Sequence, residues 1–257
     1  MNIDLTGKVV LITGASGGLG KCLAIEFAKC NASIIVHYNT NIKKAHEVVN
    51  EIQRNGQKCF AINCDITDYK EVEKMVKEIL SRFGRIDVLV NNAAVNPKDP
   101  KGKTPIYEIS EEEWDLVIDT NLKGSFICTK WVLKEMLKQG RGSIVNISST
   151  AGIMGNGSPV GAPYSISKAG MICLAKAAAK DVASKGIRIN NIAAGPFKGP
   201  TNQKNSPETN RAMAEKIPLK RIAEPEEIAY GVIFLASDLA ANITGETLNI
   251  NGGWYMP

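Results

Sequence analysis

Histidine, paired cysteines and long apolar runs are scarce in this chain of 257 residues, and each scarcity excludes a class of protein. With only His37 and His46 available, a zinc site is not expected. No apolar run approaches the length of a membrane span, and residues 1–4 lack the basic and apolar regions of a signal peptide. We therefore expect a cytoplasmic protein that does not act in a membrane.

The six cysteines show no C-x-x-C spacing, and they fall in apolar periodic segments. This pattern is typical of reduced thiols in a core and not of a disulfide framework. The net charge of +5 suits anionic ligands, but the lysines are dispersed and no aromatic residues are interleaved with them. Nucleic acid is therefore not expected as a partner.

A uniform composition, with 44% hydrophobic and 22% charged residues and no Pro/Gly/Ser-rich linker, predicts a single domain over residues 1–257. Short β-branched apolar runs alternate in it with segments of helical periodicity. The runs predict strands at 8–13, 33–38, 58–63, 87–91, 142–148, 188–193 and 246–250. The periodic segments predict helices that end near 29 and that span 42–55, 68–83, 110–139 and 164–185, with a last one starting at 225. The alternation predicts a doubly wound parallel sheet of seven strands, a Rossmann fold.

Three stretches read as loops because they are rich in glycine, proline or polar residues: 96–104, 149–163 and 194–224. The last is expected to be a mobile substrate loop with a short helix inside it. Glycine and proline at several loop positions suggest a lid that closes on the substrate.

A glycine pattern, Gly14-x-x-x-Gly18-x-Gly20, lies between the first predicted strand and the first predicted helix. Glycine lets the backbone approach a pyrophosphate, and the helix N-terminus offers unpaired N–H groups and a positive dipole. The pattern thus predicts a phosphate-binding turn, although a tight turn without a ligand is the alternative. Its spacing differs from the G-x-G-x-x-G of many dinucleotide-binding folds, which indicates a particular subset of them.

Tyr164 and Lys168 lie four residues apart where a helix is expected to begin. On a helix this spacing places both side chains on one face. A nearby ammonium favours the phenolate and so lowers the pKa of the tyrosine toward working pH. A phenol tuned in this way exchanges a proton with a carbonyl or alcohol oxygen. Such a pair also arises by chance, so its meaning depends on the rest of the chain.

Several motifs occur here in one order: Thr13-Gly14-x-x-x-Gly18-x-Gly20, Asn91-Asn92-Ala93, Ser149, Tyr164-x-x-x-Lys168 and a glycine-proline turn after the sixth strand. With them the chain resembles the short-chain dehydrogenase/reductase family over nearly its whole length. It is most similar to the 3-oxoacyl-[acyl carrier protein] reductase type, in residues 186–190 and in the ending at 244–253. Many sugar, steroid and polyol dehydrogenases share these last features.

The resemblance implies four catalytic residues. Tyr164 would be the general acid/base, and Ser149 would hold the substrate oxygen, with Ser148 as the competing serine. Lys168 would lower the pKa of the tyrosine and bind the nicotinamide ribose, and Asn121 would hold a water of the proton relay. The chemistry agrees, since hydride transfer between nicotinamide and a carbonyl carbon requires a proton at the oxygen.

The resemblance also implies where a nicotinamide cofactor binds. The expected contacts are Gly14, Ser16, Gly18, Leu19, Gly20, Asn39, Thr40, Asp65, Ile66, Asn92, Ala93, Tyr164, Lys168, Gly195 and Phe197. Asp65 would bond the adenine, but it is also suited to capping a turn. The chain departs from the family pattern at Ala94, Ala194 and Gly199, where glycine, proline and threonine are usual.

The choice between NADP and NAD depends on the end of the second strand. An acidic residue there would bind the ribose 2′-OH of NAD, whereas this chain has His37-Tyr38-Asn39-Thr40. This favours NADP, although Gly17 stands where NADP users often carry a basic residue. Asn39 and Thr40, with Lys43 or Lys44, would then face the 2′-phosphate.

The expected reaction interconverts a ketone and a secondary alcohol, with a 3-oxoacyl thioester or a similar small ketone as substrate. The alternatives are a sugar, polyol or hydroxysteroid dehydrogenase, and a regulatory protein that binds the nucleotide without turnover. Lysines around the expected substrate pocket would attract an anion or would form a solvated surface: Lys98, Lys101, Lys103, Lys198 and Lys204. Lys138, Arg141 and Lys185 are candidates for docking an acidic carrier. The two long helices at 111–139 and 164–185 are rich in small and apolar residues, and because the family pairs these helices between subunits, the resemblance implies a homotetramer.

Overall fold

A computed structural model describes residues 3–97, 104–155, 161–199 and 205–256 of the chain. Its strands pair in parallel in one sheet of seven, in the order β3-β2-β1-β4-β5-β6-β7. They are β1 (Val9–Ile12), β2 (Ser33–Tyr38), β3 (Cys59–Asn63), β4 (Val88–Asn91), β5 (Gly142–Ser149), β6 (Ile187–Ala194) and β7 (Thr247–Ile250). The predicted doubly wound Rossmann sheet is confirmed, and each observed strand lies within one or two residues of its predicted bounds.

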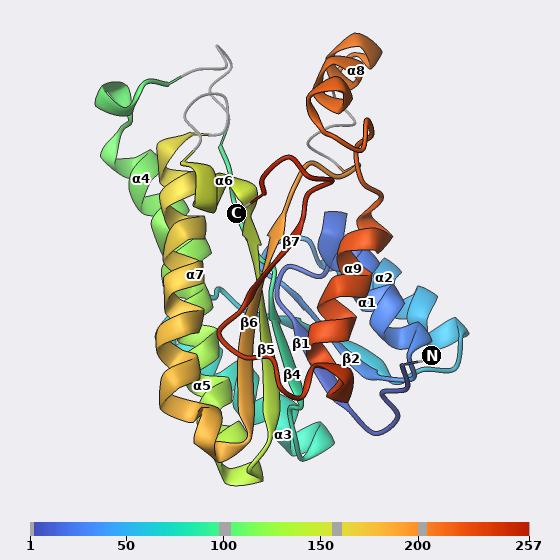
Figure 1. Ribbon diagram of the computed structural model, residues 1–257. Coiled ribbons are helices and arrows are strands. Elements are labelled where there is room, and N and C mark those ends of the chain that lie inside the picture. The colour runs from blue at the N-terminus through green and yellow to red at the C-terminus, as the bar shows by residue number, and fades with distance from the viewer. Residues whose placement is uncertain (1–2, 98–103, 156–160, 200–204, 257) are drawn as a thin grey trace.

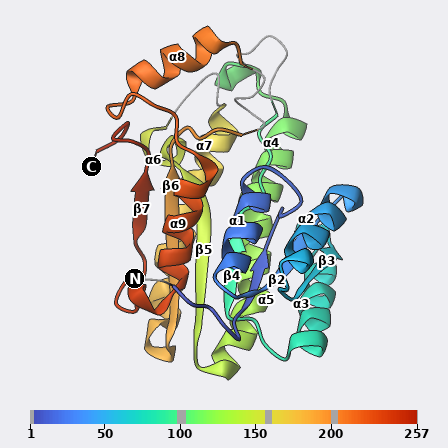
Figure 2. The same cartoon turned by 90° about the vertical axis from the view of Figure 1, so that its right-hand side faces the viewer.

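Helices cover both faces of this sheet (Figures 1 and 2). One layer holds α1 (Gly18–Lys29), α2 (Ile42–Arg54) and α9 (Pro225–Ala236). The other holds α3 (Tyr69–Phe83), α4 (Glu111–Ile118), α5 (Gly124–Gln139) and α7 (Ala162–Val182). Each layer encloses its own apolar core against the sheet, so the central strands are buried on both sides. Short 3-10 turns lie at Ile106–Glu108, Ala183–Lys185 and Asp238–Ala240.

Two predicted segments differ from the structure. The stretch 149–163 is not a loop throughout, because α6 (Thr150–Met154) begins directly after β5, with the Ser149 hydroxyl accepting from the Ala151 N–H. The long helix expected over 110–139 consists of α4, a π-helical segment η2 (Asp119–Lys123) and α5. The short helix expected within 194–224 is α8 (Pro207–Lys216), which has no buried residue and stands above the carboxyl ends of the strands (Figure 1).

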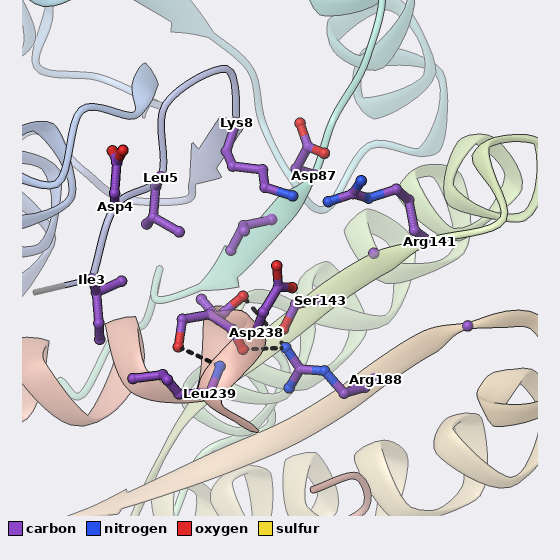
Figure 3. A pocket seen from close by; sticks show the side chains of 15 residues that line it. Ile3, Asp4, Leu5, Lys8, Asp87, Arg141, Ser143, Arg188, Asp238 and Leu239 are labelled. Atoms are coloured by element: carbon purple, nitrogen blue, oxygen red, sulfur yellow. Dashed lines mark hydrogen bonds between the residues drawn. The ribbon is translucent and has the colours of Figure 1, made fainter. Parts of the chain in front are cut away.

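A polar cavity of about 240 Å³ lies at the opposite, amino ends of the strands (Figure 3). Arg188 of β6 reaches across it and donates to carbonyl oxygens at the end of α9, those of Leu235 at 2.6 Å and Ser237 at 2.9 Å. Carbonyl groups in the last turn of a helix have no partner within the helix, so this arginine supplies one. The cavity therefore marks the junction between β6 and α9.

The six cysteines are free thiols, as expected, but they do not all lie in the core. Cys59, Cys64 and Cys128 are buried, whereas Cys173 is exposed on α7. Within the described ranges, no helix combines the length and apolarity that crossing a bilayer requires.

Candidate active site

The glycine turn lies at the carboxyl edge of the sheet, between β1 and α1. Here the strand order reverses, since β1 is flanked by β2 on one side and β4 on the other, and such a reversal opens a crevice for a ligand. Gly14 has a φ of +65°, and a Cβ at this position would lie 2.9 Å from the Ala93 Cα. A Cβ at Gly20 would lie 2.2 Å from the Gly14 carbonyl oxygen. Glycine is therefore required at both positions for the turn to pack against α1 and the end of β4.

The turn suits an anionic group. Gly17 precedes α1 without a side-chain cap, and the first turn of α1 contains no acidic residue. A Cβ built on Gly17 meets no heavy atom within 4 Å, so the space beside it is open. Uncapped N–H groups at a helix N-terminus favour a phosphate. The residues present thus fit the pyrophosphate of a dinucleotide.

The Thr13 hydroxyl links the end of β4 to this turn by hydrogen bonds. This role was not predicted from the sequence. The hydroxyl accepts from the N–H groups of Asn92 at 2.9 Å and Ala93 at 3.0 Å, and it donates to the Val90 carbonyl. The Asn92 amide in turn donates to the carbonyl oxygens of Thr13 and Gly14. A threonine directly before the first glycine of the turn was the available signal.

Ser149 and Tyr164 meet at the top of β5. The Ser149 hydroxyl interacts with the Tyr164 phenol closely enough to lower the pKa of the phenol, and α6 packs so closely against α7 that a Cβ at Gly152 would lie 2.6 Å from the Lys168 carbonyl carbon. Ser148 is buried and donates to the Lys168 carbonyl oxygen at 2.8 Å instead. Of the two candidate serines, only Ser149 is therefore in contact with the tyrosine hydroxyl.

Lys168 is buried beneath Tyr164, with its Nζ 5.6 Å from the centroid of the tyrosine ring. Nζ donates to the Ile147 carbonyl at 2.6 Å and also contacts the Met171 sulfur. Burial lowers the pKa of Lys168 to about 7.

The expected direction of the tyrosine pKa is not what the structure gives. Burial raises the pKa of Tyr164, and the hydrogen bond with Ser149 opposes that rise. The reason is desolvation, which disfavours the charged form of both the phenol and the lysine. Burial, which one sequence does not reveal, here outweighs the spacing of the pair.

Asn121 lies in the π-helical segment and is fully buried. Its side chain accepts from the Val95 N–H at 2.7 Å and donates to the Val95 carbonyl at 2.9 Å, and it contacts the Ser167 hydroxyl at 3.1 Å. Asn121 thus holds the chain after β4 against α7. This brings Asn121, Ser149, Tyr164 and Lys168 to one end of the sheet.

The remaining expected cofactor residues follow the carboxyl ends of the strands. Asn39 and Thr40 are exposed after β2, and Ile66 packs against Gly124, where a Cβ would lie 2.7 Å from the Ile66 side chain. Asp65 accepts from the N–H and hydroxyl of Thr67, which is the turn arrangement left open as its alternative. Ser16 and Leu19 belong to the turn and to α1, respectively.

The residues after β6 are tied to neighbouring segments. The Gly195 N–H donates to the Ile250 carbonyl, and Phe197 forms a parallel bridge with Ala223.

Lys198 pairs with Glu224, so it is not a free cation of the substrate loop. Lys98, Lys101, Lys103 and Lys204 lie outside the described residues. Among those that the structure does describe, no group of three or more His, Cys, Asp or Glu side chains is placed to hold a metal ion.

Comparisons with known proteins agree with this geometry. Residues 14–255 match a family model described as enoyl-(acyl carrier protein) reductase. The chain is 44% identical to a 3-oxoacyl-[acyl-carrier-protein] reductase of Staphylococcus epidermidis, over 97% of this chain and 99% of that protein. It is 42% identical to a protein of the same name from Synechocystis, over 98% of both chains. A solved structure described as a short-chain alcohol dehydrogenase of Sinorhizobium meliloti superposes with a TM-score of 0.90 at 31% identity, over 99% of this chain and 98% of that one.

Proposed function

The chain belongs to the short-chain dehydrogenase/reductase family, and from this premise we propose that it reduces a 3-oxoacyl thioester to the 3-hydroxyacyl thioester with a nicotinamide cofactor. Membership makes it an oxidoreductase that acts on CH–OH groups. The observation that carries the proposal is the placement of the Ser149 and Tyr164 hydroxyls together at the end of β5, beside the buried Lys168. Two hydroxyls in this arrangement flank a single oxygen atom, as carbonyl reduction requires.

In the proposed mechanism Tyr164 donates its proton to the carbonyl oxygen, while the Ser149 hydroxyl holds that oxygen by a hydrogen bond. A nicotinamide cofactor, when bound, would supply the hydride. In its charged form, Lys168 favours the phenolate that Tyr164 becomes. Asn121 keeps the chain at Val95 in place beside the pair.

We propose that the cofactor binds along the carboxyl edge of the sheet. The pyrophosphate would lie on the turn from Gly14 to Gly20, with Asn92 and Ala93 beside the adenosine ribose and Lys168 at the nicotinamide ribose. NADP is favoured over NAD because Tyr38-Asn39-Thr40, at the end of β2, offers no carboxylate to repel a 2′-phosphate. A lower Kd for NADPH than for NADH is expected, and equal or reversed values would contradict this preference.

The names of the relatives support a substrate bound to an acyl carrier protein. Such a carrier would need a docking surface on this chain. Arg141 and Lys185 lie beside each other at the amino ends of β5 and β6, since a Cβ at Gly186 would lie 2.5 Å from the Gly140 carbonyl. Tyr164 lies at the other end of α7, about 30 Å away at 1.5 Å per helical residue. An acidic carrier docked at this basic end would therefore lie far from Tyr164 of the same chain.

The test is a panel of substrates with NADPH and with NADH. It contains a 3-oxoacyl thioester, the corresponding 2-enoyl thioester, a keto sugar and a ketosteroid. We expect the 3-oxoacyl thioester to give the highest kcat/KM. Preference for the enoyl thioester would instead support the activity for which the family model is described, and preference for the sugar or steroid would support the alternative dehydrogenases.

A further inference from the structure

His37 is a buried histidine in a strand where the neighbouring residues Ile34, Ile35 and Val36 are all apolar. It lies near the carboxyl end of β2, at the edge of the sheet where the glycine turn follows β1. A buried polar side chain is retained at a cost unless it is hydrogen-bonded. Both ring nitrogens of His37 are bonded, and their partners belong to two different strand ends.

One ring nitrogen holds the glycine turn. The Gly14 N–H donates to His37 Nδ1 at 3.0 Å, so Nδ1 carries no proton. His37 Nε2 must then bear the hydrogen, and it lies 2.9 Å from the Cys64 carbonyl oxygen, to which it donates. The imidazole is therefore neutral and in a single tautomer, which agrees with burial lowering the pKa of His37 to about 4.

The His37 backbone adds a third connection to the same turn, because its carbonyl accepts from the Ala15 N–H at 2.9 Å. The first two residues of the turn are thus fixed by a single residue of β2. Through the Cys64 carbonyl, the same side chain ties this turn to the chain that continues into Asp65, which was expected to bond adenine, and Ile66, another expected cofactor contact. No other side chain in the described part of the chain bonds the Gly14 N–H.

We propose that His37 is a positioning residue for the dinucleotide. Its two hydrogen bonds fix the position of the turn at Gly14 relative to the segment after β3. The parts of the site that would bind the phosphates and the adenine then have a fixed separation. The proposal rests on the proposed function, because it presumes that this edge binds a nicotinamide dinucleotide. His37 does not touch the dinucleotide itself, since the side chain is 2% exposed.

The structure offers a control for the loss of hydrogen bonds between a side chain and the backbone. Gln139 also bonds backbone groups, accepting from the Ile86 N–H at 3.1 Å and donating to the carbonyl oxygens of Ile86 at 2.9 Å and Arg141 at 3.4 Å. It lies beside the amino end of β4, at the far end of the sheet from the turn. His37→Leu and Gln139→Leu therefore each remove an acceptor for a backbone N–H and a donor to backbone carbonyl oxygen, one beside the proposed site and one remote from it.

The experiment is titration of wild type and variants with NADPH and with NADH, followed by kcat at saturating cofactor. His37→Leu is expected to raise the cofactor Kd about tenfold or more, since a buried N–H loses its partner. Its kcat at saturation should stay within about twofold of wild type, because the imidazole does not touch the reacting atoms. Gln139→Leu should lower the melting temperature to a similar degree and leave the Kd unchanged.

Two further variants separate the bonds and keep the test valid if His37→Leu does not fold. His37→Asn places an oxygen near the position of Nδ1, whereas His37→Gln places its amide near Nε2. Retained affinity in His37→Asn and weakened affinity in His37→Gln would support the role at Gly14. The proposal is overturned if wild-type Kd persists in His37→Leu and His37→Gln, or if Gln139→Leu weakens binding equally. Wild type that binds neither dinucleotide would overturn the proposed function as well.

Discussion

Lys168 illustrates how the surroundings of a single residue decide its chemistry. The spacing from Tyr164 indicated a catalytic pair, and the structure brings both side chains to one end of the sheet with Ser149. The same spacing predicted the wrong direction for the tyrosine pKa, because burial depends on how α6 and α7 pack. The hydrogen bonds of His37 to the Gly14 N–H and the Cys64 carbonyl could not be predicted, since a single sequence does not reveal which backbone groups a buried side chain meets.

The pKa of Lys168 makes a prediction about stability. A lysine with a pKa of about 10.4 when unfolded and about 7 when folded binds fewer protons in the folded chain between these values. Its contribution to the free energy of unfolding therefore rises with pH from about 7 to 10. The difference in that free energy between wild type and Lys168→Met should grow by at most about 1.4 kcal/mol per pH unit.

Urea unfolding at pH 7, 8 and 9 measures this difference. Lys176→Met, which removes an exposed lysine from the same helix, controls for the general loss of a cation. A difference that stays constant or shrinks over this range would show that Lys168 remains charged in the folded chain.

Among the elements, those with long periodic patterns were predicted well and those fixed by local packing were not. The bounds of α2 and α3 follow from their apolar faces and from the Asn41 and Asp68 caps. In contrast, α6 has five residues, too few for a periodic signal, and is held by the Ser149 cap and by contact with α7. The π-helical segment, at five residues, is likewise too short for a periodic signal, and the contacts of Asn121 with the chain at Val95 are seen only in the structure.

The turn between β1 and α1 gives a prediction at this scale. Gly20→Ala places a methyl group 2.2 Å from the Gly14 oxygen and 2.7 Å from the Asn92 amide nitrogen, so the helix must move away from the strand. A loss of about 1–3 kcal/mol in the free energy of unfolding is expected. Gly17→Ala is the matched control, because its methyl group meets no heavy atom within 4 Å and its φ of −171° suits any residue. Equal stability of the two variants would contradict the close packing described for Gly20.

For the molecule as a whole, the doubly wound parallel sheet of seven strands followed from the alternation of elements, whereas the strand order came from the structure. The exposed apolar side chains were harder to predict from the sequence, because their exposure depends on which face each helix packs against the sheet. Phe126 and Leu137, three turns apart on α5, are each 45% exposed, and Ile166 on α7 is 41% exposed. Large apolar side chains exposed on neighbouring helices are typical of a surface that another copy covers.

The proposed homotetramer is tested at these positions. The double variant Phe126→Glu/Leu137→Glu should sediment as a smaller species than wild type, since two charges would be buried in the interface. Ile42→Glu, which changes an equally exposed residue on α2 in the other helix layer, is the control and should keep the wild-type size. If the double variant sediments like wild type, α5 does not contribute to association.

The central claim is that Tyr164 transfers the proton in carbonyl reduction, and one measurement tests it most directly. Tyr164→Phe is compared with wild type in kcat for a 3-oxoacyl thioester at saturating cofactor. The account predicts a fall of about 10²–10⁴-fold in kcat, with the cofactor Kd little changed, because only the hydroxyl is removed. Turnover at the wild-type rate would contradict the mechanism.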